Sequence, residues 1–283
     1  MNAKLFARSP SAQVTAIDAL RSVPGEPLAQ HPDELSIEEP LEIRIAGESY
    51  ATTMRTPGND HELVAGFLLA EGLIHSRADL GGISHCGRLG SEGAGNTIDV
   101  LPAPGAVLDS EALGHTRRGT LTSSACGMCG RKLIDDLLLR LEPAPVCPPF
   151  DRSFIAGLTA ELRSRQPSFE RTGGLHAAAI ARPETGFGSV REDVGRHNAV
   201  DKVIGRLLLD DQIPAHGALL VVSGRTSFEI VQKAIAAGIS GVVGVSAPSS
   251  LAVSTAARFG LLLCGFARGE AFNVYAGAER LAP

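Results

Sequence analysis

The sequence predicts an α/β protein with a layered α/β domain in its C-terminal half and a smaller α+β domain before it. Two observations carry this prediction. Between residues 176 and 266, short apolar segments alternate with segments of helical periodicity, which is the pattern of a sheet covered by helices. A proline-rich segment at residues 142–150 separates this region from one that begins with hairpin-like alternation of apolar and polar residues.

The chain is expected to begin with a loosely ordered arm, because residues 1–36 mix Ser, Pro and charge without sustained periodicity. Residues 40–56 alternate apolar and polar side chains around a Gly-containing turn, which predicts a β-hairpin. Residues 59–74 start with Asn and Asp and carry apolar residues at helical spacing, which predicts a capped helix. The Gly-rich residues 87–96 predict a loop, and TIDVLP after them predicts a strand.

An amphipathic helix is predicted to close the N-terminal part. Residues 130–141 place five apolar side chains on one helical face: Leu133, Ile134, Leu137, Leu138 and Leu141. The segment EPAPVCPPF at residues 142–150 then holds four prolines, through which a helix cannot continue. We therefore predict an N-terminal domain over residues 37–145 and an α/β domain over residues 146–283.

Strands and helices are expected to alternate in the C-terminal domain. Strands are predicted at residues 176–181, 217–224, 239–247 and 261–266, and helices at residues 195–210, 226–238 and 249–260. The strands are uniformly apolar, as in strands that are buried on both faces. We therefore expect a largely parallel sheet.

Four loops of similar composition belong to this pattern: REDVGRHN (191–198), SGRTS (223–227), SAPSS (246–250) and FARGEAFN (266–273). In open α/β sheets, ligands bind in the loops at the carboxyl ends of the strands. Backbone amides at helix starts and guanidinium groups bind phosphate. Gly and Ser also make ordinary turns and caps, and that reading fits any single loop. Four such loops together favour a site for an anionic, phosphorylated ligand.

Composition limits the class of protein. The net charge of −5 argues against a general nucleic-acid binder, which carries a basic surface. No apolar run approaches the roughly 18 residues that cross a bilayer, and the first residues lack the apolar core of a signal peptide. Five cysteines, an odd number, do not form a disulfide framework in a chain of this length. We expect a cytoplasmic protein with reduced thiols and no membrane partner.

Cys126 and Cys129 precede the predicted helix at residues 130–141, and the residues alone leave three uses for them open. A structural zinc site needs four Cys or His ligands, and only His85 and Cys86 form another compact candidate, so we predict no metal. A dithiol oxidoreductase places such a pair after a buried strand, whereas a polar and basic segment precedes it here.

The third use is a nucleophilic sulfur. Gly127 and Gly130 flank the pair, and the start of the following helix favours a thiolate. Four nearby cations favour it further: Arg117, Arg118, Arg131 and Lys132. A thiolate in such a loop is suited to sulfur transfer, since it can attack a donor persulfide and present the sulfur to an acceptor.

The segment GLHAAA around His176 is similar to the His-Ala-Glu signature of zinc deaminases, in which the His binds metal and the Glu moves protons. Ala178 stands where the Glu would be, and no Pro-Cys-x-x-Cys follows, so deaminase chemistry is excluded. His176 is then either a binding residue or a core histidine with satisfied hydrogen bonds, and both remain open.

The sequence resembles the formate dehydrogenase accessory sulfurtransferases, the FdhD family, in six segments that occur in one order: SSACGMCGRK, RTGGLHAAA, REDVGRHNAVDKVIG, SGRTSFEIVQKA, VVGVSAPSSLAV and GFARGEAFNVY. The resemblance runs from about Pro40 to Tyr275 and does not cover the residues before it. It implies a cytidine-deaminase-like α/β domain, a smaller N-terminal domain and a homodimer.

The resemblance further implies a sulfur carrier. Such a protein takes persulfide sulfur from a cysteine desulfurase and delivers it to the molybdenum cofactor, Mo-bis(molybdopterin guanine dinucleotide), for a formate dehydrogenase. GDP is expected to bind as a partial mimic of that cofactor. The alternative is a zinc-stabilised or dithiol-redox chaperone of the dehydrogenase without sulfur transfer.

The resemblance also assigns residues. The first cysteine of the motif carries the persulfide, which gives that role to Cys126, with Cys129 as the second catalytic cysteine. Cofactor binding falls on the segment that follows the last core strand: Phe266, Ala267, Arg268, Gly269, Glu270 and Ala271. Glu270 departs from the basic or small polar character of the family at this segment, and its negative charge works against phosphate contact there.

Overall fold

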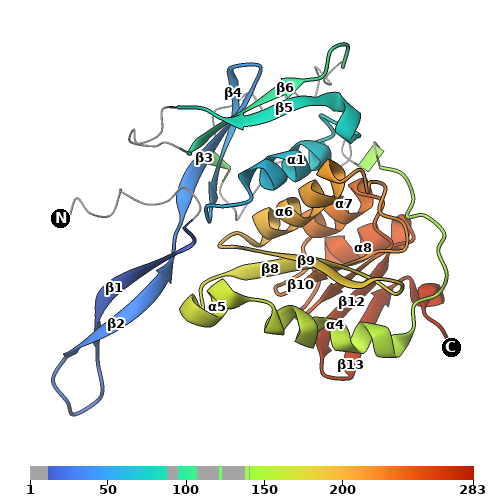
Figure 1. The fold of residues 1–283 in the computed structure, drawn as a ribbon. Helices are drawn as coiled ribbons and strands as arrows, with labels where there is room; N and C mark the ends of the chain where they lie inside the picture. Colours follow the sequence, from blue (N-terminus) through green and yellow to red (C-terminus); the bar gives the residue numbers. More distant parts are fainter. Residues whose placement is uncertain (1–11, 88–94, 107–120, 123–137, 140) are drawn as a thin grey trace.

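The computed structural model describes residues 12–87, 95–106, 121–122, 138–139 and 141–283. These residues form two main β-sheets with a layer of helices between them, and a further helical layer on the outer face of the larger sheet (Figure 1). The predicted α/β class is therefore confirmed. Within the described ranges, no helix is long and apolar enough to cross a membrane.

The larger sheet has six strands in the order β13 (Ala271–Ala276), β12 (Leu262–Arg268), β11 (Gly241–Gly244), β10 (Leu219–Val222), β8 (His176–Arg182) and β9 (Gly186–Asp193). Strands were expected at β8, β10, β11 and β12, and all four are present. The expectation of a largely parallel sheet is wrong, since only β10–β11 and β11–β12 are parallel pairs. Short hairpins add β9 and β13 antiparallel to their neighbours, and such connections are too short for a parallel crossover.

Helices cover both faces of this sheet. The expected helices are confirmed as α6 (Arg196–Leu209), α7 (Phe228–Ala236) and α8 (Ser250–Arg258), which face the smaller sheet (Figure 1). The opposite face is covered by α4 (Arg152–Ser164), beside the short α5 (Pro167–Thr172). The sequence pattern of α4 is clear, because Asp151 caps its start and its buried residues follow helical spacing: Ile155, Leu158, Thr159 and Leu162.

The smaller sheet has five described strands in the order β5 (Leu80–His85), β6 (Thr97–Pro102), β3 (Glu39–Ile45), β4 (Glu48–Arg55) and β7 (Leu121–Thr122). The predicted hairpin is confirmed as β3 and β4, and the predicted TIDVLP strand as β6. The expected helix is α1 (Asp60–Ala70), although the side chain of Asn59 makes no capping hydrogen bond. Two single turns of 3-10 helix complete the elements of the described residues, η2 (Arg77–Asp79) and η3 (Ala278–Arg280).

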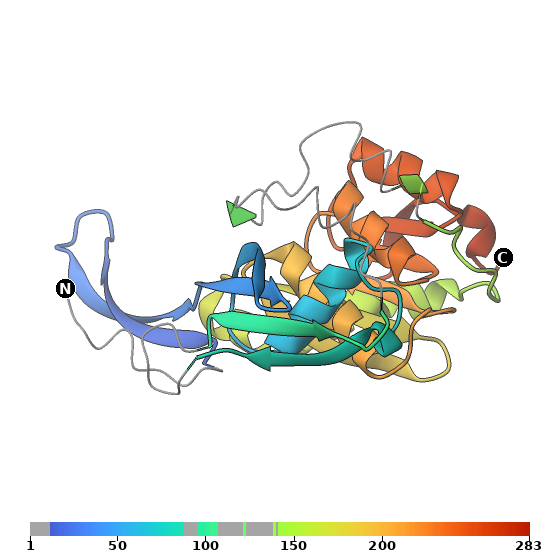
Figure 2. The same ribbon diagram turned by 90° about the horizontal axis from the view of Figure 1, so that it is seen from above.

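The N-terminal arm differs from the expectation of loose order. From Val14 onward it forms an antiparallel hairpin of β1 (Val14–Arg21) and β2 (Ala29–Ser36) that projects from the body (Figures 1 and 2). The Arg171 guanidinium pairs with Glu34, and the Ser36 hydroxyl donates to Thr172 Oγ1 at 3.0 Å. Periodicity did not reveal the hairpin because most of its side chains are exposed on both faces and have no core to face.

The proline-rich segment at residues 142–150 contains no helix and leads from the smaller sheet to the larger one. The two sheets nevertheless share one continuous apolar cluster, which joins Leu41 and Ile43 of β3 to Val200 and Ile204 of α6. The division into domains at this segment stays a prediction. The loop predicted at 87–96 and the helix predicted at 130–141 lie mostly outside the described residues, but Leu138 is buried and Leu139 exposed, as an amphipathic helix requires.

Helices α1 and α6 cross in backbone contact at two glycines. A Cβ atom on Gly205 would overlap the carbonyl oxygen of Glu62, and one on Gly66 would overlap the carbonyl oxygen of Asp201. Without side chains at these positions the helix axes approach closely, which brings the two sheets onto a single helical layer. The crossing therefore sets how the halves of the molecule meet.

We predict that Gly205→Ala destabilises the protein by roughly 3 kcal/mol or more, because a methyl group cannot fit without separating the two helices. Urea unfolding followed by far-UV circular dichroism measures this, as the chain has no tryptophan. Gly157→Ala in α4 is the matched control, since nothing lies within 4 Å of its Cβ position. That change should be neutral or stabilise by up to about 1 kcal/mol. Equal effects at both positions would contradict the close crossing.

Candidate functional site

The four predicted ligand loops meet at one edge of the larger sheet. Strands β10, β11 and β12 run parallel, so the loops after them leave at the same edge. Strand β8 is antiparallel to β10 and therefore begins at this edge with His176, whose partner in the register is Asp193 at the end of β9. All four predicted segments reach this edge, but two of them are not loops over most of their length. Arg191–Asp193 belong to β9 and Arg196–Asn198 to α6, and the segment 266–273 belongs to β12 and β13 except for the turn at Gly269 and Glu270.

Backbone hydrogen bonds lock neighbouring loops together. The Thr226 amide donates to the Ala247 carbonyl at 3.2 Å, and the Ser249 amide donates to the Thr226 carbonyl at 3.0 Å. The Phe266 amide donates to the Ser246 carbonyl at 3.2 Å. The edge is therefore one connected surface that reaches from the end of β10 to the end of β12.

A cluster of cationic side chains lies beside Gly224. A Cβ atom on Gly224 would stand 3.2 Å from His176 Nδ1 and 3.9 Å from Arg196 Cδ. Arg225 is exposed, and Arg196 is half-buried with an Nε that has no hydrogen-bond partner among the described residues. Within the described part of the chain neither arginine pairs with a carboxylate. Two cations left unpaired at one edge can bind an anion through charge-assisted hydrogen bonds.

His176 is half-buried in this cluster. Burial lowers the pKa of its imidazole, and the positive charges of Arg196 and Arg225 lower it further. The ring is therefore neutral near pH 7 and can offer either a donor or an acceptor to a ligand. Of the two readings that the sequence left open, its position among unpaired cations favours a binding residue.

The six residues assigned to cofactor binding end β12 and begin β13. Gly269 and Glu270 form the turn, and Gly269 has a positive φ of 57°. Ala267 is buried, and its carbonyl accepts from Thr159 Oγ1 of α4 at 3.0 Å, so its side chain faces the core rather than a ligand. The side chains of the other non-glycine members lie exposed at the edge: Phe266, Arg268, Glu270 and Ala271.

Phe266 has an unusual conformation for an aromatic residue. Its φ is 51°, in the left-handed region, and its side chain is 45% exposed. A bulky residue held there costs free energy, and such strain is typical of functional sites. The aromatic ring is available to stack on a planar ligand.

A buried polar cluster supports the edge from below. Lys202 Nζ lies 2.7 Å from Asp193 Oδ2 with both side chains fully buried, and it donates to the Thr56 carbonyl at 2.8 Å. Asp193 also accepts from the Thr56 amide at 3.1 Å and from Asn198 Nδ2 at 3.0 Å. Sequence reasoning did not single out these residues, although the five polar residues of RHNAVDK, in a helix expected to pack on the sheet, were a signal.

The same cluster leads to the segment that holds the two cysteines. Thr53 Oγ1 donates to Asn198 Oδ1 at 3.4 Å, and Thr53 is the register partner of Thr122 in the parallel β4–β7 pair. Thr122 is the last described residue before the pair. Cys126 and Cys129 themselves lie outside the described residues. The cysteine segment therefore starts beside β4. Thr53 alone separates its starting point, Thr122, from the buried polar cluster under the sheet edge.

The remaining cysteines differ in environment. Cys264 is buried in β12, and burial raises the pKa of its thiol to about 12. Cys86 and Cys147 are half-buried free thiols. Among the described residues there is no group of three or more His, Cys, Asp or Glu side chains that could hold a metal ion.

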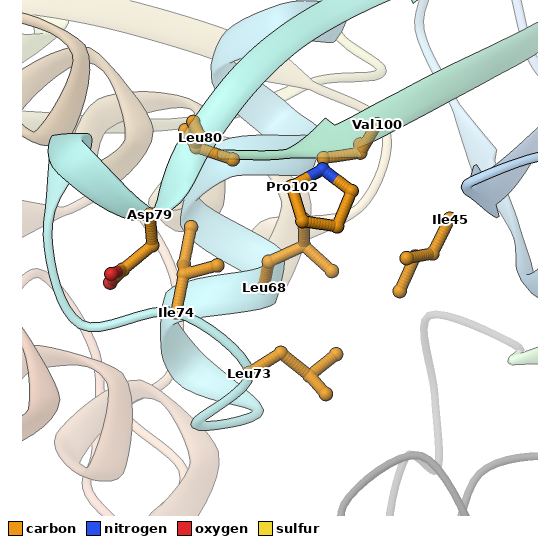
Figure 3. Close-up of a pocket in the computed structure, with 8 residues that line it drawn as sticks. All are labelled: Ile45, Leu68, Leu73, Ile74, Asp79, Leu80, Val100 and Pro102. Atoms are coloured by element: carbon orange, nitrogen blue, oxygen red, sulfur yellow. The ribbon is translucent and has the colours of Figure 1, made fainter. Parts of the chain in front are cut away.

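Two hollows lie away from the loops of this edge. The first is an apolar gap under the smaller sheet, lined by side chains such as Ile45, Leu68 and Val100 and too narrow for a water molecule (Figure 3). The second is an open depression of about 440 Å³, lined among others by Arg182 at the end of β8 and His216 before β10. Neither contains residues of the four loops.

Comparisons with known proteins agree on one family. The sequence model of the FdhD/NarQ family matches residues 36–282. The chain is 52% identical over 255 residues to the sulfur carrier protein FdhD of Anaeromyxobacter dehalogenans strain 2CP-C, covering 88% of each chain. It is 46% identical over 260 residues to the sulfur carrier protein FdhD of Streptomyces coelicolor, covering 90% of this chain and 91% of that one.

A solved structure shares the fold. It is a protein from Desulfotalea psychrophila that is provisionally described as a formate dehydrogenase accessory protein. The match has a TM-score of 0.75 at 23% identity and covers 96% of this chain and all of the other.

We predict that Arg225→Ala raises the pKa of His176, because it removes one of the positive charges that disfavour the imidazolium. The pKa is measured from the ring resonances in an NMR titration of the full chain, with His176→Gln to assign the signal. Sulfate, whose charge is constant between pH 5 and 8, should raise the pKa of wild-type His176 by occupying the cationic edge. Arg182→Ala, in the depression at the other end of β8, should leave that pKa unchanged. An unchanged pKa in Arg225→Ala would show that the two side chains do not interact.

Proposed function

The chain belongs to the FdhD/NarQ family, and on that premise we propose that it is a sulfur carrier that serves a formate dehydrogenase. In this proposal Cys126 accepts sulfur from a cysteine desulfurase, and the sulfur then passes to the molybdenum cofactor, Mo-bis(molybdopterin guanine dinucleotide), as acceptor. The observation that carries the proposal is the cationic edge, because an acceptor with guanosine diphosphate arms needs unpaired cations at a ligand edge.

The sulfur step balances without an added oxidant. The Cys126 thiolate attacks the terminal sulfur of a donor persulfide, a new S–S bond forms on Cys126, and the donor cysteine leaves as a thiolate. The buried Cys264 cannot take this role, because its raised pKa keeps the thiol protonated and inert. Since persulfide chemistry needs reduced thiols, we also propose a cytoplasmic location.

The acceptor is proposed to lie across the four loops. Arg225 and Arg196 would contact phosphate groups, and Phe266 would stack on a planar ring at the same edge. Arg268, Gly269, Glu270 and Ala271 border this surface, and the negative charge of Glu270 would keep phosphate away from that side chain and toward the arginines. The layering is proposed to follow the cytidine-deaminase-like arrangement with a different chemistry at its edge.

Contacts of Thr122, just before the cysteine segment, support a short path from the cysteines to the proposed acceptor edge. Thr122 pairs with Thr53 on β4, and Thr53 bonds Asn198 beside Asp193. Because these residues are packed or hydrogen-bonded, the point at which the cysteine segment begins is held close to the edge. Direct transfer of sulfur from Cys126 to the cofactor requires that the two sites lie close together.

We further propose that the protein acts as a homodimer. The β1–β2 hairpin carries exposed apolar side chains, among them Ile17, Leu20 and Leu28, and two strands alone are marginally stable in water. A second copy of the chain would cover part of this surface. Light scattering on the full chain measures the mass, and a monomer at micromolar concentration would contradict the dimer.

We predict that Cys126→Ala abolishes persulfide loading and formate dehydrogenase activation, whereas Cys129→Ala keeps loading and impairs turnover. The physical reason is that the first cysteine before a helix is the more exposed and the more acidic thiol. Tandem mass spectrometry of the peptide with both cysteines, after incubation with a desulfurase and cysteine, locates the added sulfur.

Cys147→Ser is the matched control, since Cys147 is a half-buried free thiol outside the motif, and this change should leave loading intact. Sulfur found only on Cys129, or full activation by Cys126→Ala, would overturn the assignment. Stoichiometric tightly bound zinc, or a cycling Cys126–Cys129 disulfide as the productive state, would instead support the chaperone alternative.

We predict that the full chain binds GDP and that Arg225→Ala or Arg268→Ala weakens binding about tenfold or more, since a charge-assisted hydrogen bond contributes roughly 1.5–3 kcal/mol. Binding should also weaken as salt is raised. Titration calorimetry measures both effects, with Arg182→Ala as a control at the opposite edge. Wild-type affinity in both arginine variants would place the acceptor site elsewhere.

A further inference from the structure

The same sheet edge holds a serine, a histidine and a glutamate that the sulfur chemistry does not use. Ser227 Oγ lies 3.1 Å from His197 Nε2, and Glu229 Oε2 lies 3.3 Å from the other ring nitrogen, Nδ1. Ser227 precedes the first turn of α7, whereas His197 is in the first turn of α6. The topology thus brings together residues that are about 30 positions apart in the sequence.

Ser227 is not used as an ordinary helix cap. It occupies the N-cap position of α7, yet its side chain makes no capping hydrogen bond. Ser249 occupies the same position at α8, and there the side chain accepts from the Ala252 amide at 3.2 Å. The hydroxyl of Ser227 is directed to the histidine instead, and the first amides of α7 have no partner within the helix.

The imidazole is held in one orientation. His197 is 7% exposed, and Glu229 is held in turn by Lys233, whose Nζ lies 3.8 Å from Glu229 Oε1. Lys233 is almost fully buried and also lies 2.7 Å from Asp201 Oδ1. A carboxylate beside Nδ1 favours the proton on that nitrogen, and Nε2 then accepts from the Ser227 hydroxyl, which is the arrangement that activates a serine nucleophile.

The surroundings indicate the kind of substrate. Arg225 stands two residues before Ser227, and Arg196 stands directly before His197. Both arginines are unpaired among the described residues and lie close enough to His176 to lower its pKa. An electrophile that carries a phosphate group would be drawn to Ser227 by these charges.

We propose that Ser227 is a nucleophile activated by His197 and Glu229, and that it hydrolyses carboxylic esters or anhydrides that bear a phosphate group. Ser227 Oγ attacks the carbonyl carbon while its proton moves to His197 Nε2. The bond to the leaving oxygen breaks, and the leaving group takes the proton from His197. Water then attacks the acyl carbon and gives a proton to His197 Nε2, the bond from the acyl carbon to Ser227 Oγ breaks, Ser227 takes that proton back, and the carboxylic acid is released. No oxidant or metal enters this sequence.

The test on the full-length protein uses a fluorophosphonate probe, which forms an O–P bond with an activated serine and releases fluoride. We expect the adduct on Ser227 and none on the more exposed Ser249 in the same tryptic digest. Ser227→Ala should abolish labelling, and His197→Gln should slow it by about 100-fold or more. Ser254→Ala, an exposed serine on α8, should label at the wild-type rate. No adduct on Ser227, or equal labelling of Ser227 and Ser249, overturns the proposal.

Turnover provides the second measurement. Acetyl phosphate should be hydrolysed with release of inorganic phosphate by wild type and not by Ser227→Ala. Arg225→Ala should raise the KM for acetyl phosphate more than the KM for the neutral p-nitrophenyl acetate. Hydrolysis that survives in Ser227→Ala overturns the assignment of the nucleophile. These outcomes concern bond cleavage at a serine, so their failure is distinguishable from failure of sulfur loading at Cys126.

Discussion

The buried pair of Asp193 and Lys202 is the interaction on which the rest of the structure depends. Both side chains are removed from water, which is costly unless every charge is matched. The partners come from both halves of the molecule, because Thr56, directly after β4 of the smaller sheet, supplies an amide to Asp193 and a carbonyl to Lys202. The cost of removing the two charges from water is therefore offset only when the two sheets are assembled. The same contacts hold the end of β9 in place.

The close crossing of α1 and α6 extends this constraint over the whole molecule. Contact between backbones at Gly66 and Gly205 allows one helical layer to serve both sheets. The apolar cluster that results runs through both halves without interruption. Since α6 also carries Arg196, His197 and Asn198, a shift of this helix would move the sheet edge and the contact to Thr53 together.

The cationic side chains of the protein fall into two groups, one buried with carboxylate partners and one at the sheet edge. Lys202 and Lys233 are buried with carboxylate partners and contribute to assembly. Arg196 and Arg225 remain without such partners in the described ranges, although the chain as a whole carries a net charge of −5. An unpaired cation in an acidic protein is a local feature that attracts anions to one place, which is why the edge rather than the overall charge indicates the ligand.

The sequence by itself determined the class of the fold, the alternation of strands and helices from His176 onward, and the loops that form the edge. These are local properties, since periodicity and turn residues act over a few positions. The family followed from motifs, which are local as well.

Sequence reasoning left out the β1–β2 hairpin, whose exposed strands have no apolar face to reveal them, and mistook the direction of β8 within the sheet. Only the tertiary structure decided that Asp193 meets Lys202 and Thr56, that His176 lies near two arginines, and that Ser227 faces His197 rather than its own helix. Each of these contacts joins residues from separate elements, and buried polar groups find their partners according to topology, which no local pattern encodes.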